Sequence, residues 1–279
     1  MSESTAPARS ISRSISIRHP ELDLSRVPRH WNGGDPFATH FMNALSSTFP
    51  DGEAFFVKSV MAFRGEIDDP VLQKQVREFA GQEGQHSRLH DAHTKLLLDQ
   101  GYTGIETQNR VARWFMDLSV RRAPKASLAA TAALEHLTAI LARRLLTDAE
   151  RFTGEMDATM GRLWRWHALE EAEHKSVAYD VLMRVAPSHG MRVFMLAQNT
   201  VGVLAEVMAR ACYMLWKDGL LFRAETWKGA WRFLFGEVGF LRGVGRDYWP
   251  WYRRDFHPDQ LDDTDLLDAW RPRIAAEIA

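Results

Sequence analysis

Apolar residues recur at intervals of three and four along most of the chain, which is the spacing of helices with one buried face. Prolines and glycines divide this pattern into segments, because proline favours the first turn of a helix and glycine its end. The pattern predicts an all-α protein. The predicted helices cover residues 37–49, 51–66, 69–100, 107–122, 125–152, 155–186, 190–217 and 222–241, and a polar tail ends in a short helix.

Changes in the pattern divide the chain into four parts. Residues 1–36 are rich in serine and then in proline and glycine, which predicts a disordered or irregular arm with a disordered tail at residues 1–18. Residues 37–187 carry the long amphipathic helices. Residues 188–258 are apolar and Trp-rich, so we expect helices that pack on the others, dip into one membrane leaflet or line an apolar substrate channel. Residues 259–279 form a polar tail.

Two of the long predicted helices carry the same polar signature. Glu83 and His86 form a Glu-x-x-His pair within QEGQHSRLH, and Glu171 and His174 form a second pair within WHALEEAEHKSVAYD. Residues three apart lie on one face of a helix, so both members of a pair can reach one metal ion. Glu170 lies four residues before His174 and so shares its helix face, which makes Glu170 an alternative ligand to Glu171.

Two further glutamates stand alone in apolar helical stretches. Glu53 lies in the first turn of the helix predicted at 51–66, where it could instead complement the helix dipole. Glu135 lies in the middle of the helix predicted at 125–152, where the dipole gives no reason for it. A buried carboxylate is costly unless something neutralises it. His136 points about 100° away from Glu135, so we interpret it as a core residue or as a partner of a ligand.

These positions together match a known ligand set. One glutamate on each of two helices and Glu-x-x-His on each of two others hold two metal ions in carboxylate four-helix bundles. Four buried carboxylates repel one another, and two divalent cations would cancel their charge. Carboxylates and imidazoles without thiolate suit iron, with manganese or zinc as alternatives. The predicted ligands are Glu53, Glu83, His86, Glu135, Glu171 and His174.

Two more histidines lie one helical turn from these pairs. His167 precedes Glu171 by four residues, and His90 follows His86 by four. Residues four apart share a helix face. Each imidazole is therefore a candidate metal ligand, and otherwise a group that orients a ligand.

Composition limits the class of binding partner and the cellular compartment that we expect. The chain has 35 basic and 36 acidic residues and a net charge of −1, which argues against a nucleic-acid partner. The single cysteine, Cys212, excludes an internal disulfide and fits a reducing compartment. No apolar run reaches the ~18–20 residues of a membrane span. We expect a cytoplasmic protein, with membrane association or a homodimer through the apolar part at residues 188–258 as further expectations.

The motifs themselves resemble known families. QEGQHSRLH, EHLTA and WHALEEAEHKSVAYD are similar to a bacterial family known as predicted metal-dependent hydrolases, and the similarity extends to the sequence FHP that begins at Phe256. The order of the ligands across residues 51–187 resembles the ferritin-like di-iron carboxylate superfamily. That resemblance implies a ferritin-like four-helix bundle with a crossover helix and redox chemistry at the six ligands. With His167, the last helix also resembles that of the para-aminobenzoate N-oxygenases, whose di-iron site carries a third histidine.

Three functions follow from these resemblances and from the ligand set. The main hypothesis is a di-iron oxygenase that activates O₂ to oxidise a small hydrophobic or aromatic substrate, with an external electron donor. The alternative is a hydrolase whose two metals supply hydroxide and polarise a carbonyl or phosphoryl group, although no separate nucleophile motif favours it. The third is metal storage or detoxification, and the additional residues 188–279, which ferritins lack, count against it.

Overall fold

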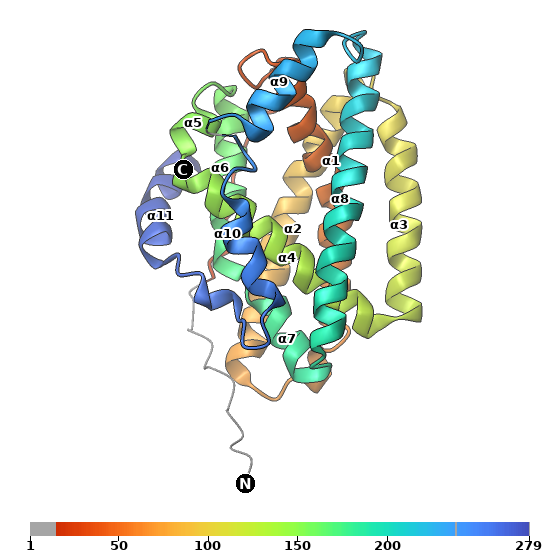
Figure 1. Ribbon diagram of the computed structural model, residues 1–279. Coiled ribbons are helices and arrows are strands. Elements are labelled where there is room, and N and C mark those ends of the chain that lie inside the picture. Colours follow the sequence, from red (N-terminus) through yellow and green to blue (C-terminus); the bar gives the residue numbers. More distant parts are fainter. Residues whose placement is uncertain (1–14, 238, 279) are drawn as a thin grey trace.

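The computed structural model describes residues 15–237 and 239–278, and its regular elements are helices (Figure 1). No strand occurs in these two ranges, so the all-α prediction is confirmed. The α-helices are α1 (Pro36–Met61), α2 (Pro70–Asp99), α3 (Gly104–Arg122), α4 (Pro124–Thr147), α5 (Ala149–Thr153), α6 (Ala158–His174), α7 (Val177–Val185), α8 (His189–Lys217), α9 (Ala224–Phe235), α10 (Val244–Tyr248) and α11 (Thr264–Ile278). Short 3₁₀ helices cover Arg64–Glu66, Trp249–Tyr252 and Pro258–Gln260.

Three of the long helices begin at an aspartate that caps them. The side chains of Asp35, Asp69 and Asp157 accept hydrogen bonds from backbone N–H groups in the first turns of α1, α2 and α6. These N–H groups have no partner within the helix, so a carboxylate in front of them fixes where the helix starts.

Several predicted helix boundaries are wrong: the helix predicted at residues 125–152 divides at Asp148 into α4 and α5, and the one predicted at 222–241 ends at Phe235. Two further differences have a physical reason in the packing. The sequence predicts a break at Pro50, but α1 continues through it, with Phe49 before the proline and Phe55 and Phe56 after it buried. Packing of an apolar face therefore outweighs the backbone hydrogen bond that proline removes. Conversely, the helix predicted at residues 155–186 divides into α6 and α7 at Lys175, whose buried ammonium group pairs with Asp263.

The centre of the fold is a bundle of α1, α2, α4 and the consecutive pair α6 and α7. Helix α1 packs against α2, and α4 packs against both α6 and α7. Helix α8 crosses α1 and α4, and α3 lies at the outer side, where it contacts the same two helices (Figure 1). The C-terminal elements cover the bundle: α9 packs on α1, α10 on α4, and α11 on α6.

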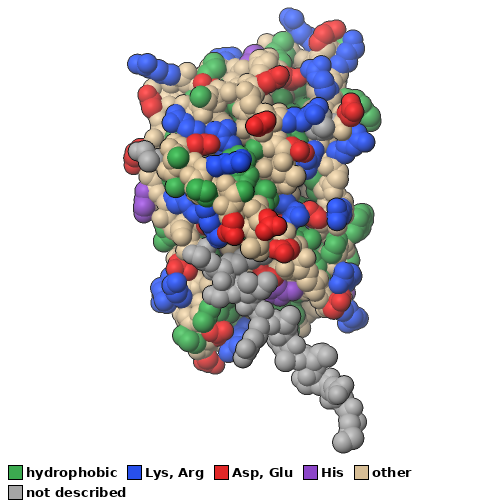
Figure 2. Space-filling view, turned by 90° about the vertical axis from the view of Figure 1, so that its left-hand side faces the viewer, with side chains coloured by type: hydrophobic (Ala, Val, Ile, Leu, Met, Phe, Trp, Pro, Cys, Tyr) green, Lys and Arg blue, Asp and Glu red, His purple; other side chains and the backbone are tan. Residues whose placement is uncertain are grey.

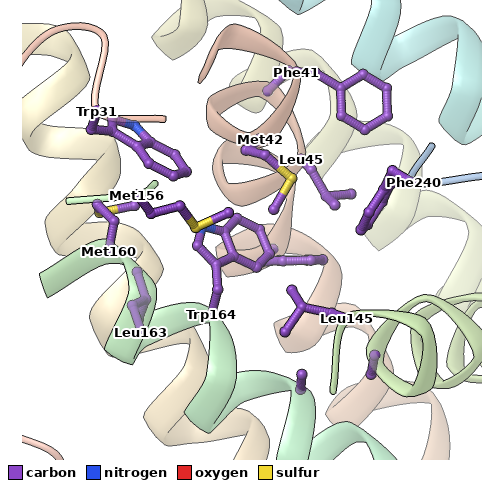
Figure 3. Packing of buried hydrophobic residues seen from close by; sticks show 14 of the residues in the cluster. Trp31, Phe41, Met42, Leu45, Leu145, Met156, Met160, Leu163, Trp164 and Phe240 are labelled. Carbon is purple, nitrogen blue, oxygen red and sulfur yellow. The ribbon is translucent and has the colours of Figure 1, made fainter. Parts of the chain in front are cut away.

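Buried apolar residues form two clusters, one toward each end of the bundle. The first cluster includes Phe49 and Leu89, and part of it is shown in Figure 3. The second includes Phe55 and Phe79. Each of the four bundle elements passes from one cluster to the other, and the polar residues singled out above lie at these crossings. A polar layer therefore lies between two apolar ones.

The N-terminal arm lies against the bundle. Ile15 is buried in the second cluster, and a Cβ at Gly81 would come within 2.3 Å of Cδ1 of Ile17, so α2 has a glycine where the arm crosses it. The predicted disordered tail is thus wrong for residues 15–18, while residues 1–14 lie outside the described part of the chain.

Among the described residues, no helix is both long and apolar enough to cross a bilayer. The face that carries α11 shows acidic, basic and apolar side chains interspersed (Figure 2).

Trp251 ties the C-terminal segment to the bundle, which makes its removal a test of this packing. It is fully buried, its ring stacks on His136 at 4.7 Å, and its Nε1–H donates to the carbonyl oxygen of Arg192. Trp251→Ala should lower the free energy of unfolding by about 3–5 kcal/mol, because it leaves a large cavity. Trp249→Ala, at a position 66% exposed, should change it by less than about 0.5 kcal/mol. Chemical denaturation of both variants measures the difference, and equal effects would contradict the packing.

Candidate metal centre

The six predicted ligands come together in the polar layer of the bundle. None of them is more than 2% exposed, although all are polar or charged. They come from four elements: Glu53 from α1, Glu83 and His86 from α2, Glu135 from α4, and Glu171 and His174 from α6. Helical spacing explains the convergence, because these residues continue the buried stripe of each helix.

The side chains form two ligand groups. Within each group, one ligand atom per residue lies within 4.8 Å of the others. The first group is Glu53, His86 and His167, and the second is Glu83, Glu171 and His174. Glu135 adjoins the second group, since its Oε2 lies 3.2 Å from Nε2 of His174.

Two glutamates lie between the groups. Oε1 of Glu171 is 3.2 Å from Nε2 of His167, and its Oε2 is 3.7 Å from Nε2 of His174. Oε1 of Glu83 is 3.2 Å from the same nitrogen of His174, and its Oε2 is 3.9 Å from Nδ1 of His86. Each carboxylate therefore presents one oxygen to each group, as a residue that bridges two metal ions would.

Many of these buried atoms lack a hydrogen-bond partner among the described residues. They include both oxygens of Glu83 and of Glu135, one oxygen each of Glu53 and Glu171, and Nε2 of His167 and of His174. An unsatisfied buried polar group costs about 1–3 kcal/mol, and more when charged. Carboxylate oxygens and imidazole nitrogens are common ligands of divalent cations. The arrangement fits two metal ions, whose identity the donor set does not decide.

Burial keeps most of the carboxyl groups protonated when no metal is bound. Together with repulsion from neighbouring carboxylates, it raises the pKa values of Glu53 and Glu83 well above their ordinary range. Burial likewise raises the pKa of Glu135 to about 7, against the pull of His174. Metal ions that bind here must displace these protons.

Glu171 and His174 form the charged pair of the centre. Burial alone would raise the pKa of Glu171, but the nearby imidazoles of His167 and His174, at 3.2 and 3.7 Å, outweigh it and hold the pKa well below its usual range. Burial alone would lower the pKa of His174, but Glu135 and Glu171 raise it well above 6.5. Glu171 is therefore ionised even in the metal-free protein.

Gln82 fixes the orientation of His174. The side-chain Nε2 of Gln82 donates to the carbonyl oxygen of Ser16 and to Oε2 of Glu173, both at 3.0 Å. Its Oε1 is therefore the acceptor at 2.9 Å from Nδ1 of His174, so Nδ1 carries the proton. Nε2, which faces the carboxylates, is then the nitrogen that can bind a metal once it has released its proton.

The structure brings Glu171, and not Glu170, into the ligand groups. Nδ1 of His86 faces Glu171 at 3.6 Å, whereas its Nε2 lies 3.2 Å from Oε2 of Glu170. Burial raises the pKa of Glu170 to about 7, although Arg18 lies 3.1 Å from its other oxygen. A carboxylate on the far nitrogen of a ligating histidine is a frequent arrangement that orients the ring.

The two additional histidines have different places. His167 belongs to the first ligand group, but His90 does not. Nε2 of His90 lies 2.9 Å from Nδ1 of His167, and its Nδ1 lies 2.7 Å from Oγ of Ser46, which also contacts His93. Burial lowers the pKa of His90 well below 6.5 and that of His93 to about 4. His90 is therefore neutral and positioned to orient His167.

Sequence patterns missed the surrounding partners. Gln82 and Glu173 each stand next to a predicted ligand and on a buried helix face, a signal that could have identified them. Arg18 pairs with Glu173 at 2.9 Å and with Glu170, but it lies in an irregular arm without periodicity, so nothing in the pattern marks it.

The raised pKa values predict a pH dependence for the metal-free protein. Glu53, Glu83, Glu135 and His174 retain protons in the folded state that the unfolded chain releases, so stability falls as pH rises. Above about pH 7.5, histidines with lowered pKa values are nearly all neutral in both states and add little opposing slope. The thermal midpoint of chelator-treated protein should therefore be lower at about pH 9 than at about pH 7.5.

The same protein saturated with Mn²⁺ serves as the comparison. Bound metal replaces the protons, so its stabilising effect should grow with pH. A metal-free midpoint that rises between the two pH values would contradict the protonation described for these groups.

A substitution at Gln82 tests the role of the surrounding hydrogen bonds. Gln82→Leu removes the acceptor for His174 and should weaken metal affinity about 10–100-fold. Gln85→Leu is the matched control, because Gln85 lies on the same helix and accepts a hydrogen bond from Arg88 at the exposed surface. Competition with a fluorescent chelator measures both affinities. If Gln82→Leu binds metal as tightly as the control, this hydrogen bond does not orient the ligand.

Comparison with known proteins adds the reaction class. The family model described as predicted metal-dependent hydrolase matches residues 16–262. No curated protein and no solved structure matches the chain. A hydrolase family contradicts the expectation of a di-iron oxygenase, which is wrong, and it supports the hydrolase alternative and an enzymatic role. Because the match covers most of the sequence, the chain belongs to the predicted metal-dependent hydrolase family.

Proposed function

We propose that the protein is a hydrolase in which each ligand group holds one metal ion. The observation that carries the proposal is the pair of buried carboxylate–imidazole groups with Glu83 and Glu171 between them. Oxygen and imidazole ligands without thiolate suit manganese, iron or zinc. Membership of the family supports hydrolysis as the reaction.

The metals and the protein would contribute different things. Two bound divalent ions would supply a water of lowered pKa and polarise the carbonyl or phosphoryl oxygen of a substrate. Glu83 and Glu171 would hold the ions at a fixed separation. Gln82, Glu170 and His90 would keep three imidazoles in the orientation that binding requires, because each contacts the ring nitrogen turned away from the centre.

The surroundings support water as the nucleophile. Ser87, which follows His86, carries a hydroxyl close to the ligand groups that could act as a nucleophile in place of water. Its hydroxyl group instead donates a hydrogen bond to Oε2 of Glu53 at 3.0 Å, and so holds a proposed metal ligand in position. The apolar clusters on both sides of the polar layer exclude bulk solvent, which strengthens the electrostatic effect of any bound cation.

Hydrolysis by the reloaded protein tests the proposal. Chelated protein should be inactive, and addition of Mn²⁺, Fe²⁺ or Zn²⁺ should restore release of nitrophenol from a panel of nitrophenyl carboxylic and phosphoric esters. Glu171→Ala should lower this activity by about 100-fold or more, because it removes the ligand between the groups. Glu106→Ala, on the exposed side of α3, should leave it unchanged.

The proposal fails if the panel is not hydrolysed in a metal-dependent way. It also fails if Glu171→Ala retains the activity of the Glu106→Ala control.

A further inference from the structure

An apolar cavity adjoins the metal centre. It lies between α1, α4 and α6, and His167 and Glu171 form part of its wall. The rest of the lining is mostly hydrocarbon; its other polar groups are the indole N–H of Trp164 and the hydroxyl of Thr138, which already donates to the carbonyl oxygen of Glu135. The carboxylate and the imidazole are thus at the end by the ligand groups, while most of the remaining surface favours an apolar occupant.

Some of the apolar residues that line the cavity are labelled in Figure 3. Met42 and Leu45 from α1, together with Phe240, face Leu145 and Trp164 across the space. In this conformation the cavity measures about 40 Å³, enough for a few water-sized groups. Neither a ring system nor a chain of several carbons fits unless a wall moves, and an unbranched chain, which has the smallest cross-section, needs the smallest movement.

Phe240 is the part of the wall whose displacement would leave the three bundle helices in place. Of the described residues that line the cavity, it alone lies outside α1, α4 and α6. It sits on the turn after α9, where its N–H donates to the carbonyl oxygen of Phe233 and its ring stacks on Phe233 at 5.7 Å. Gly239 permits this turn, since a Cβ there would lie 2.4 Å from the carbonyl oxygen of Leu234.

Helix α9, which precedes this turn, also has apolar side chains on its exposed face. Trp227, Trp231 and Phe235 follow one another at intervals of four on α9, and each is between 41% and 68% exposed. Residues four apart share a helix face. An apolar chain that approaches Phe240 along α9 therefore meets an apolar surface.

We propose that this cavity binds the unbranched apolar acyl chain of a substrate ester, with the ester carbonyl at the ligand groups and Phe240 limiting the chain length. The inference rests on the proposed hydrolase function. In the reaction, the oxygen of water bonds to the carbonyl carbon and the bond from that carbon to the alkoxy oxygen breaks. The alkoxy oxygen takes up one proton of the water and the other is released to solvent, so a carboxylate and an alcohol leave without oxidation or reduction.

A series of nitrophenyl esters with acyl chains of about two to twelve carbons tests the proposal. For the metal-loaded wild type, kcat/KM should rise by up to roughly fourfold per added methylene until the cavity is full. Ala142→Leu narrows the cavity and should lower kcat/KM for the long esters at least tenfold, while the acetyl ester is unaffected. Phe240→Ala should move the optimum to longer chains.

Ala139→Leu is the matched control for the narrowing variant. Ala139 lies on α4 with Ala142 and is equally buried, at 5% against 6% exposed, but it does not line the cavity. It should retain the chain-length profile of the wild type. Metal content is measured on every variant, so that a loss of the centre is distinguished from a change in the cavity.

Binding of cis-parinaric acid, a fluorescent fatty acid, separates this inference from the proposed function. Binding that Ala142→Leu weakens and Ala139→Leu does not supports the chain site, even if no ester is hydrolysed and the hydrolase proposal fails. If esters are hydrolysed but Ala142→Leu and Ala139→Leu have the same chain-length profile, the inference is overturned and the hydrolase proposal stands. Absence of both parinarate binding and a chain-length effect also overturns it.

Discussion

Burial of four carboxylates in the middle of a helical bundle is the constraint on which the rest of the structure depends. Carboxylates in an apolar interior are strongly destabilised, by loss of hydration and by mutual repulsion. Here the polar layer is only a few residues deep, and each bundle element has apolar residues on both sides of it. These two clusters hold the helices in register and so fix the positions of the ligand atoms. Divalent cations would turn the repulsion within the layer into attraction.

Hydrogen bonds also connect the N-terminal arm and helix α11 to the residues around the metal centre. Glu173 accepts hydrogen bonds from Arg18 in the N-terminal arm and from Arg271 in α11. Burial alone would raise the pKa of Glu173, but the two guanidinium groups outweigh it and lower the pKa. Glu173 in turn accepts from Gln82, which orients His174. Segments far from the centre in sequence therefore contribute to the geometry of one ligand.

The sequence predicts which carboxylates come together in the bundle better than it predicts the residues around them. Glu53, Glu83, Glu135 and Glu171 could be identified because a carboxylate within an apolar periodic stripe is conspicuous, and helical spacing brings such residues together. The sequence could not identify the roles of Arg18, Ser46 and Phe240, which lines the cavity, because their contacts arise from irregular segments or from separate helices. The choice between Glu170 and Glu171 also needed coordinates, since both share a buried helix. The reaction class was mispredicted because carboxylates and imidazoles serve both redox and hydrolytic metals.

Anomalous diffraction from crystals of Mn²⁺-loaded protein tests the central claim most directly. Two peaks roughly 3.5–4 Å apart should appear in the polar layer, one beside Glu53, His86 and His167 and the other beside Glu83, Glu135 and His174, with Glu171 between them. A cluster of His30, His40 and Asp218 lies elsewhere in the fold and also has three ligand-type side chains close together. Peaks only at that cluster, or none in the polar layer, would contradict the account.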